Sequence, residues 1–472
     1  MVRFFRPLPG RRPLRHIAVV AALAIAAPCL ARAEALLVVE ADTGKVLQAD
    51  NATYPWYPAS VTKIMTAYVT LKAVKEGRLA LDDVLTVSPV AASQAPSKMG
   101  FRPGTQVTVE NALAMMMVKS ANDMAVVLAE GVGGSIDGFS ALMNQAAQRL
   151  GMTQTSYVNP NGLPAEGQVT SARDLAILAR AVIRELPEYE YFMHIPAIRF
   201  GRKVTNNFNQ LIGRYPGADG FKTGFICASG YNLVGSATRN GKRLIAVVLG
   251  SNSGRQRAVR AAQLLERGFA GNGLAWLRPS LGTVDNLAPI DASPPNLRDE
   301  MCGGKRKRPA TDEDEDATTL AANGTSGGET AATFFAAGLQ PPTAKPSELL
   351  AAAPAAAEPM VVYTGAKKTG AALIAAMATD AEKQTTRRGK KSRIAASKPN
   401  AGTASKTTAK PEAKLAAKPD AKPAAKPAVR HAAARLEAGT KPADKSAAAS
   451  PAPKPAKPKA AAKPKTDGKP AG

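Results

Sequence analysis

A serine and a lysine three residues apart form the first pair in the sequence that could do covalent chemistry. They begin and end the stretch Ser60-Val61-Thr62-Lys63, and the apolar spacing that follows predicts a helix. One helical turn puts both side chains on one face, and a helix N-terminus adds unpaired N–H groups. A lysine amine can act as general base towards a serine when burial or a nearby cation lowers its pKa. Alone, the motif is more typical of a capping serine and a solvated lysine.

Two more short motifs add polar groups. Ser120-Ala121-Asn122 interrupts a helical pattern over residues 109–130, so a hydroxyl and an amide can point into a cleft from a turn. Lys222-Thr223-Gly224 leads towards strand-like apolar runs. On an edge strand, this lysine and threonine can hold a carboxylate, and the glycine lets a substrate backbone approach closely. A second copy, Lys368-Thr369-Gly370, has no predicted strands around it, and we interpret it as coincidence.

In this order the three motifs resemble those of the D-alanyl-D-alanine carboxypeptidases, the low-molecular-mass penicillin-binding proteins of the S11 peptidase family. The resemblance runs over residues 35–269 and includes the stretches Tyr57-Pro58-Ala59, Lys98-Met99-Gly100, Asn159-Pro160-Asn161-Gly162-Leu163 and Ser171-Ala172-Arg173-Asp174. It implies a serine peptidase that removes the terminal D-alanine from peptidoglycan stem pentapeptides through an acyl-serine. It also implies acylation by β-lactam antibiotics and no metal or other cofactor.

The resemblance implies catalytic roles for three residues. Ser60 would be the acylated nucleophile, Lys63 its base, and Ser120 a proton relay towards the leaving D-alanine.

Five more residues would bind substrate. Asn122 would hold the peptide amide, Lys222 would support the relay serine electrostatically, and Thr223 would bind the terminal carboxylate, with Gly224 beside it. The N–H of Phe225 would complete an oxyanion hole with that of the nucleophile. Many relatives have histidine at this last position, so any role of an imidazole in deacylation is lost here.

The elements that must position these residues predict an α/β (α+β) fold of the β-lactamase/transpeptidase-like type. Apolar runs flank Asp42-Thr43-Gly44-Lys45, and a second pair flanks Asn240-Gly241, which is a strong hairpin signal. Helical spacing follows residue 60 and recurs over residues 109–130, 136–150, 172–185 and 254–269. We therefore expect an antiparallel sheet flanked by helices, with a mainly helical insertion.

The N-terminus has the pattern of a cleaved export signal. Residues 1–33 carry six arginines and no acid, and residues 17–30 are uncharged and apolar. That run has 14 residues, whereas a membrane span needs about 20. Ala31-Arg32-Ala33 offers a cleavage site near Ala33. We expect an exported protein, periplasmic or associated with the cell wall.

Composition divides the remainder. We expect a peptidase domain over 34–275, a connecting segment over 276–302 and a disordered Lys/Ala/Pro-rich tail over 303–472. Of the net charge of +25, residues 301–472 contribute 30 Lys and Arg against 15 Asp and Glu. The central domain is therefore nearly neutral, and the total charge is no sign of nucleic-acid binding. The tail would contact an anionic envelope surface or act as a spacer without a partner, and it lacks the amphipathic pattern of a membrane anchor.

Two cysteines, Cys227 and Cys302, remain after signal cleavage. An exported chain permits one disulfide between them, and two thiols are the alternative.

Alternative functions each require particular residues. A Ser-His-Asp hydrolase or a zinc peptidase needs histidines, and the mature chain has only His194 and His431. A class A-like β-lactamase needs a glutamate that activates water; Glu166 is suitably placed, but Thr170 stands where an asparagine is expected. An endopeptidase that cleaves peptidoglycan cross-links remains an alternative. A non-catalytic, basic envelope-binding protein would rely on the tail.

Overall fold

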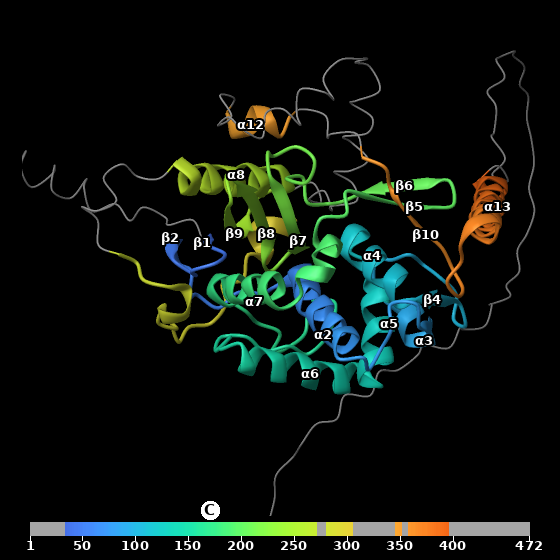
Figure 1. Ribbon diagram of the computed structural model, residues 1–472, viewed down its shortest axis with the longest axis horizontal. Coiled ribbons are helices and arrows are strands. Elements are labelled where there is room, and N and C mark those ends of the chain that lie inside the picture. The colour runs from blue at the N-terminus through green and yellow to red at the C-terminus, as the bar shows by residue number, and fades with distance from the viewer. Residues whose placement is uncertain (1–33, 271–279, 305–344, 352–356, 396–472) are drawn as a thin grey trace, which may run out of the picture. The chain divides into compact units, whose positions relative to one another are not determined.

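The computed structural model describes residues 34–270, 280–304, 345–351 and 357–395 (Figure 1). Contacts divide the chain into residues 1–399 and 400–472, and every described residue lies in the first unit. The predicted signal peptide and its cleavage site lie outside the described residues, as does most of the predicted tail.

A five-stranded antiparallel sheet is the centre of the described structure (Figure 1). Its order is β2-β1-β9-β8-β7, which places β7 at one edge. The strands are β1 (Ala35–Glu40), β2 (Val46–Asp50), β7 (Ala218–Ile226), β8 (Gly230–Arg239) and β9 (Lys242–Ser251). Both predicted hairpins are present: β1 pairs with β2, and β8 pairs with β9 through Asn240 and Gly241, whose positive φ angles of 49° and 74° suit a tight turn.

Each face of this sheet is covered by helices, which explains why its strands are apolar on both sides. Along β1, Leu37 and Val39 face one core, whereas Leu36 and Val38 face another. The second core is closed by α8 (Gly254–Ala270), which lies along one face of the sheet (Figure 1). On the opposite face the first core contains residues of η1, α2 and α7 and extends into the helical insertion.

The remaining elements build the helical region and its small sheets. The helices and 3-10 turns there are η1 (Ala59–Thr62), α2 (Lys63–Lys75), α3 (Pro89–Ser93), α4 (Val109–Lys119), α5 (Asn122–Gly133), α6 (Ile136–Arg149), α7 (Ala172–Glu185) and η2 (Pro187–Met193). Two short hairpins pair β3 (Val84–Thr86) with β4 (Gln106–Thr108), and β5 (Ala197–Phe200) with β6 (Lys203–Asn206). The predicted α+β architecture with a helical insertion is confirmed.

Among the described residues no single helix is long and apolar enough to cross a membrane, although α5 and α6, bent by 82° at their junction, would meet that criterion as a pair.

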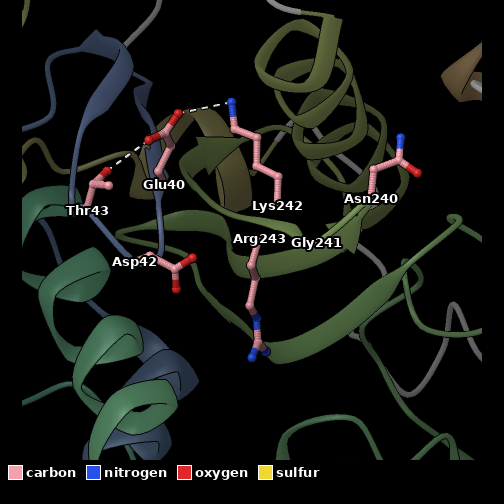
Figure 2. Close-up of a pocket in the computed structure, with 7 residues that line it drawn as sticks. All are labelled: Glu40, Asp42, Thr43, Asn240, Gly241, Lys242 and Arg243. Carbon is pink, nitrogen blue, oxygen red and sulfur yellow. Dashed lines mark hydrogen bonds and ion pairs between the residues drawn. The ribbon is translucent and has the colours of Figure 1, made fainter.

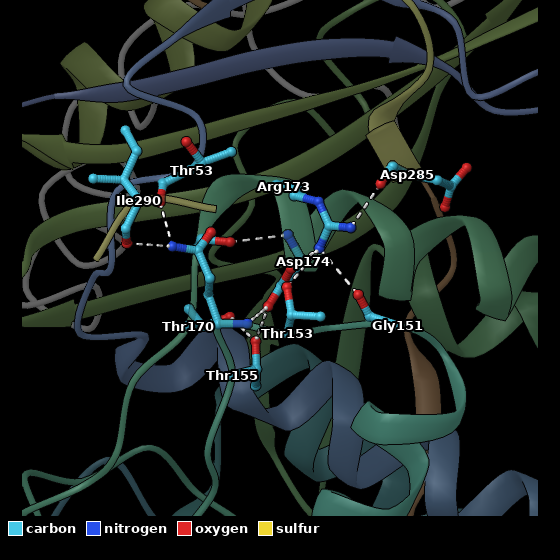
Figure 3. A network of polar contacts seen from close by, with 11 residues as sticks. Thr53, Gly151, Thr153, Thr155, Thr170, Arg173, Asp174, Asp285 and Ile290 are labelled. Carbon is cyan, nitrogen blue, oxygen red and sulfur yellow. Dashed lines mark hydrogen bonds and ion pairs between the residues drawn. The ribbon is translucent and has the colours of Figure 1, made fainter. Parts of the chain in front are cut away.

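The start of α7 is tied to the rest of the domain by a buried ion pair (Figure 3). Ser171 caps the helix as predicted, by accepting a bond from the Asp174 N–H at 3.2 Å. Arg173 donates to Asp174 at 2.7 Å and to the carbonyl of Asp285 at 2.9 Å. Burial raises the pKa of Asp174, although bonds from Thr155, Gln154 and Arg173 favour the carboxylate. This network joins α7 to η4 (Val284–Asn286) of the connecting segment.

The connecting segment packs on the domain that precedes it. Val284, Leu297 and Met301 are buried in the main core. The segment ends in α9 (Arg298–Cys302), and Cys302 is joined to Cys227 in a disulfide with a Cα–Cα distance of 5.7 Å. The structure therefore contains the disulfide and not the alternative of two thiols. The disulfide attaches residues 294–302 to the chain directly after β7.

Part of the predicted disordered tail has regular structure, which corrects the expectation for those residues. The short strand β10 (Met360–Val362) pairs in parallel with β5, and Val362 is buried in the main core. α13 (Gly370–Ala395) follows, and α12 (Pro346–Leu349) lies before it. The apolar run at 360–363 needs no core of its own because it adds to an existing sheet edge. Residues 370–395 contain no proline, so a helix can form there. Residues 305–344, 352–356 and 396–472 of the expected tail lie outside the described part.

Candidate active site

Ser60 and Lys63 meet where η1 passes into α2. The side-chain nitrogen of Lys63 lies within hydrogen-bond distance of Ser60 Oγ, at 2.9 Å, and the lysine side chain is fully buried. It also donates to Asn122 Oδ1 at 2.8 Å and to the carbonyl of Asn161 at 2.7 Å. Three chain segments far apart in sequence therefore meet at one amine. The helical turn predicted from Ser60 is present, although its first residues form a 3-10 turn.

The backbone before the serine is held in an unusual conformation. Ala59 has φ of +51°, which L-residues adopt at a cost. Gly162 lies so close that a Cβ on it would overlap the carbonyl of Ala59. Behind this turn, the Asn232 amide donates to the carbonyls of Tyr57 and Pro58, each at 3.0 Å. These contacts fix the position of the backbone that leads into Ser60.

Ser120 and Asn122 lie on the turn between α4 and α5, where the sequence predicted an interruption. Ser120 ends α4 in the left-handed conformation, with φ of 60° and ψ of 31°, and is 5% exposed. Asn122 begins α5 and donates to the carbonyl of Ala95 at 2.9 Å, while its oxygen faces Lys63. The neighbouring Asp123 is fully buried and accepts bonds from the N–H groups of Met99 and Gly100 at 3.0 and 2.8 Å. Asp123 thus secures the loop that covers this turn.

The third motif lies on β7, an edge strand as the sequence analysis considered, and this strand lies beside η1. Lys222 and Thr223 are each 1% exposed, and the Lys222 ammonium donates to the carbonyl of Thr223 at 3.2 Å. A Cβ on Gly224 would lie only 2.7 Å from the Ser60 nitrogen. The glycine therefore lets β7 approach the backbone of Ser60 closely.

Residues that sequence reasoning missed support β7 from behind. Arg257 on α8 is 2% exposed and donates to the carbonyl of Gly224 at 3.3 Å. Its guanidinium lies 5.5 Å from the centre of the Tyr231 ring, and that ring stacks on Phe225 at 4.3 Å. The carbonyl of Asn161 was also missed as a partner of Lys63. Asn161 stands in a stretch that carries the family resemblance, but a backbone carbonyl and a distant arginine leave no pattern in the sequence.

A cavity of about 530 Å³ opens next to the 3-10 turn that carries Ser60. One wall is residues 162–169, a second contains Ile226 and Ala228, and Pro294, Asn296 and Arg298 belong to the connecting segment. Ala59, which precedes the nucleophile, also lines it.

A second cavity of about 310 Å³ lies where the turn after β1 meets the β8–β9 turn (Figure 2). The Glu40 carboxylate pairs there with Lys242 at 3.0 Å and accepts a bond from Thr43 at 2.8 Å. Partial burial raises the pKa of Glu40, but the bonds from Lys242 and Thr43 outweigh it and hold that pKa below its usual value. None of the predicted site residues lines this cavity.

Histidine, cysteine, aspartate and glutamate side chains form no group of three or more that could hold a metal ion within the described ranges. The polar groups beside Ser60 are instead an amine, amides and backbone N–H groups. This is the arrangement of a serine–lysine acyl-transfer site on a mixed α/β fold.

Comparison with known proteins agrees with that class. The family model described as D-alanyl-D-alanine carboxypeptidase, Peptidase_S11, matches residues 22–253. The chain is 40% identical over 245 residues to the D-alanyl-D-alanine carboxypeptidase DacC of Escherichia coli (strain K12), covering 50% of this chain and 61% of DacC. It is 34% identical over 250 residues to DacB2 of Mycobacterium tuberculosis, covering 51% of this chain and 83% of DacB2. A solved structure of penicillin binding protein 5 from Haemophilus influenzae is 36% identical, with coverage of 50% and 70% and a TM-score of 0.49.

The chain belongs to the D-alanyl-D-alanine carboxypeptidase family of S11 peptidases. It spans about three fifths of the length of the first curated relatives that it matches.

Proposed function

We propose that this protein is a serine-type D-Ala-D-Ala carboxypeptidase that removes the terminal D-alanine from peptidoglycan stem pentapeptides. The observation that carries the proposal is the contact of Lys63 with Ser60 at 2.9 Å inside a family domain of this activity. β-Lactam antibiotics would acylate the same serine and inhibit the enzyme.

The chemistry follows from the partners of Lys63. A neutral amine has two N–H groups and one lone pair, and the oxygens of Asn122 and Asn161 suit the two N–H groups. The lone pair can then accept the Ser60 proton as the hydroxyl attacks the carbonyl carbon of the scissile bond. The backbone N–H groups of Ser60 and Phe225 would stabilise the oxyanion, an effect of about 3–4 kcal/mol for one such donor.

Collapse of the tetrahedral intermediate breaks the peptide bond. Ser120 would pass a proton to the leaving D-alanine nitrogen, supported by the buried charge of Lys222, while Thr223 holds the terminal carboxylate. Asn122 would orient the amide that precedes the scissile bond, and Gly224 allows the substrate backbone to lie against β7. Water then hydrolyses the acyl-serine, and the proton returns to Ser60.

The location of the protein is part of the proposal. The N-terminal pattern and a peptidoglycan substrate both favour export, with cleavage near Ala33 and residence in the periplasm or at the cell wall. The basic tail would contact anionic groups of the envelope, and we expect no nucleic-acid partner.

The decisive experiment is labelling with a fluorescent penicillin. Ser60→Ala should abolish labelling and D-alanine release while the circular dichroism spectrum and unfolding midpoint stay native. Ser280→Ala, which removes an exposed hydroxyl outside the site, serves as the matched control. Labelling that persists in folded Ser60→Ala would refute the assignment of the nucleophile.

Two alternatives give different results in the same assays. Rapid and continuous turnover of nitrocefin would favour a β-lactamase, because a carboxypeptidase stays acylated for many minutes. Release of cross-linked dimers from isolated sacculi, without release of D-alanine from pentapeptides, would favour an endopeptidase.

A further inference from the structure

A buried asparagine on β8 lies next to the turn that carries Ser60. Asn232 is fully buried, and in the β7–β8 ladder it stands opposite Gly224. Residues opposite each other on neighbouring strands project to the same face of the sheet. At Gly224 this face has no side chain, and a Cβ there would lie 2.7 Å from the Ser60 nitrogen. A glycine on one strand and an asparagine on the next therefore meet the same turn of chain, η1 and the residues before it.

The side-chain amide of Asn232 joins backbone groups from two segments. Its nitrogen donates to the carbonyls of Tyr57 and Pro58, each at 3.0 Å. Its oxygen accepts a bond from the N–H of Gly250 on β9 at 3.1 Å, where the register of the β8–β9 ladder shifts. Both amide hydrogens and the amide oxygen are thus engaged, so the side chain is held in one orientation.

The two carbonyls belong to the residues just before a strained position. Ala59 follows with φ of +51°, a conformation that persists in an L-residue only when its surroundings hold it. On one side, Asn232 fixes the peptide groups that precede this residue. On the other, Gly162 packs against the Ala59 carbonyl, where a Cβ would overlap it. The strained residue is therefore held from both sides.

The conformation of Ala59 decides where the N–H of Ser60 points. A peptide group is planar, so the ψ angle of Ala59 sets the direction of the next N–H. In the proposed mechanism this N–H is one of the two oxyanion donors. The Lys63 amine is held separately, by the oxygens of Asn122 and Asn161. Asn232 can therefore affect the oxyanion donor while the proton acceptor stays in place.

We propose that Asn232 is a positioning residue for acylation: its amide holds the backbone before Ala59 so that the N–H of Ser60 stays directed at the oxyanion. It acts through the carbonyls of Tyr57 and Pro58 and touches no reacting atom. The inference rests on the proposed serine peptidase activity and adds a residue outside the three motifs. Because the oxyanion forms only on the way to the acyl-enzyme, loss of Asn232 should slow acylation and leave the initial binding of a β-lactam unchanged.

Asn232→Leu tests the proposal, since leucine has a similar shape and no hydrogen-bonding group. Stopped-flow measurements with a fluorescent penicillin give the dissociation constant of the initial complex and the acylation rate constant at saturation. We expect the rate constant to fall about 10²-fold, as for a displaced oxyanion donor, and the dissociation constant to stay within about twofold. Only folded molecules are labelled, so partial unfolding lowers the amplitude and not the rate constant.

A second variant separates the contacts of Asn232 and serves if the first does not fold. Asn232→Asp keeps an acceptor for the N–H of Gly250 and loses at least one of the two donors. It should therefore also acylate slowly. Asn144→Leu is the matched control, because Asn144 on α6 bonds the N–H and the carbonyl of Tyr157, each at 2.8 Å, outside the site. It should lower the unfolding midpoint and keep the native acylation rate constant.

A transition-state analogue gives a readout that a purely structural role would not change. The boronic acid analogue of N-acetyl-D-alanine forms a tetrahedral adduct with a serine, and one adduct oxygen takes the place of the oxyanion. Its inhibition constant should rise in the Asn232 variants by about the factor by which the acylation rate constant falls. In Asn144→Leu the inhibition constant should stay native.

A native acylation rate constant in the folded Asn232 variants would overturn the positioning role. A weaker initial complex with an unchanged rate constant would overturn it as well, because the residue would then serve binding. Failure of the proposed function would look different: the wild-type protein itself would take no penicillin label and release no D-alanine.

Discussion

At the scale of single residues, the amine of Lys63 decides what the site can do. It is fully buried and contacts a hydroxyl, an amide oxygen and a backbone carbonyl. A general base acts in its neutral form, in which its lone pair can accept the proton of Ser60. The same three contacts orient the amine towards Ser60.

We therefore expect Lys63→Met to slow acylation by penicillin about 10²- to 10⁴-fold, because the proton of Ser60 loses its acceptor. Methionine has a similar length and tolerates burial, so the fold should persist. The rate of acylation, followed with a fluorescent penicillin, is the measurement. Lys75→Met, on the same helix but 41% exposed, is the matched control and should acylate normally. A native rate in Lys63→Met would show that another group takes the proton.

At the scale of elements, the edge strand β7 carries the motif that we propose binds substrate, and it is held from three sides. η1 lies against Gly224, α8 supplies Arg257 from behind, and the disulfide attaches the connecting segment directly after the strand. An edge strand keeps backbone groups available for a peptide, and these supports keep it in register with the nucleophile. The two cysteines are 75 residues apart in sequence, so the disulfide closes a long loop.

Replacing both Cys227 and Cys302 by serine should lower the free energy of unfolding by about 2–4 kcal/mol, since the unfolded chain regains the freedom of that loop. Urea denaturation of the oxidised proteins measures the difference. Dithiothreitol should lower the stability of the wild-type protein towards that of the double variant and leave the variant unaffected. An unfolding midpoint that responds to neither the substitutions nor the reductant would contradict a stabilising role.

At the scale of the whole molecule, charge and catalysis are separated along the chain. Residues 396–472 carry 17 Lys and Arg against 5 Asp and Glu, whereas residues 34–300 are nearly neutral. Between these regions, β10 and the residues after it are anchored to the domain: Asn111 donates to the carbonyl of Tyr363 at 3.2 Å, and Thr364 donates to Asp380 at 3.2 Å. A truncation that tests the basic segment should therefore keep the chain through residue 395.

We expect a protein that ends at residue 395 to keep its kcat/KM on soluble peptides but to sediment less with isolated sacculi at low salt. The reason is that the removed segment carries a net charge of +12, and attraction to anionic groups is screened beyond roughly 8 Å at physiological salt. Co-sedimentation over a series of salt concentrations provides the measurement. Equal sedimentation of the full-length and shortened proteins at every salt concentration would identify the segment as a spacer.

The sequence by itself determined the local elements and the family. Asn240-Gly241 requires a tight turn, Ser171 caps a helix, and the pattern over residues 109–130 breaks at Ser120, because each of these outcomes depends on neighbouring residues alone. The order of three motifs was specific enough to indicate the family that the comparisons confirm.

Only the tertiary structure decided which distant groups meet. The carbonyl of Asn161 at Lys63 and Arg257 behind Gly224 depend on the approach of segments tens of residues apart. The pairing of Cys227 with Cys302 was open for the same reason, since a Cα–Cα distance cannot be deduced from spacing. Residues 360–362 were assigned to a disordered tail because they are too short to form a core; β5 offers them an edge that exists only once the rest of the domain has folded.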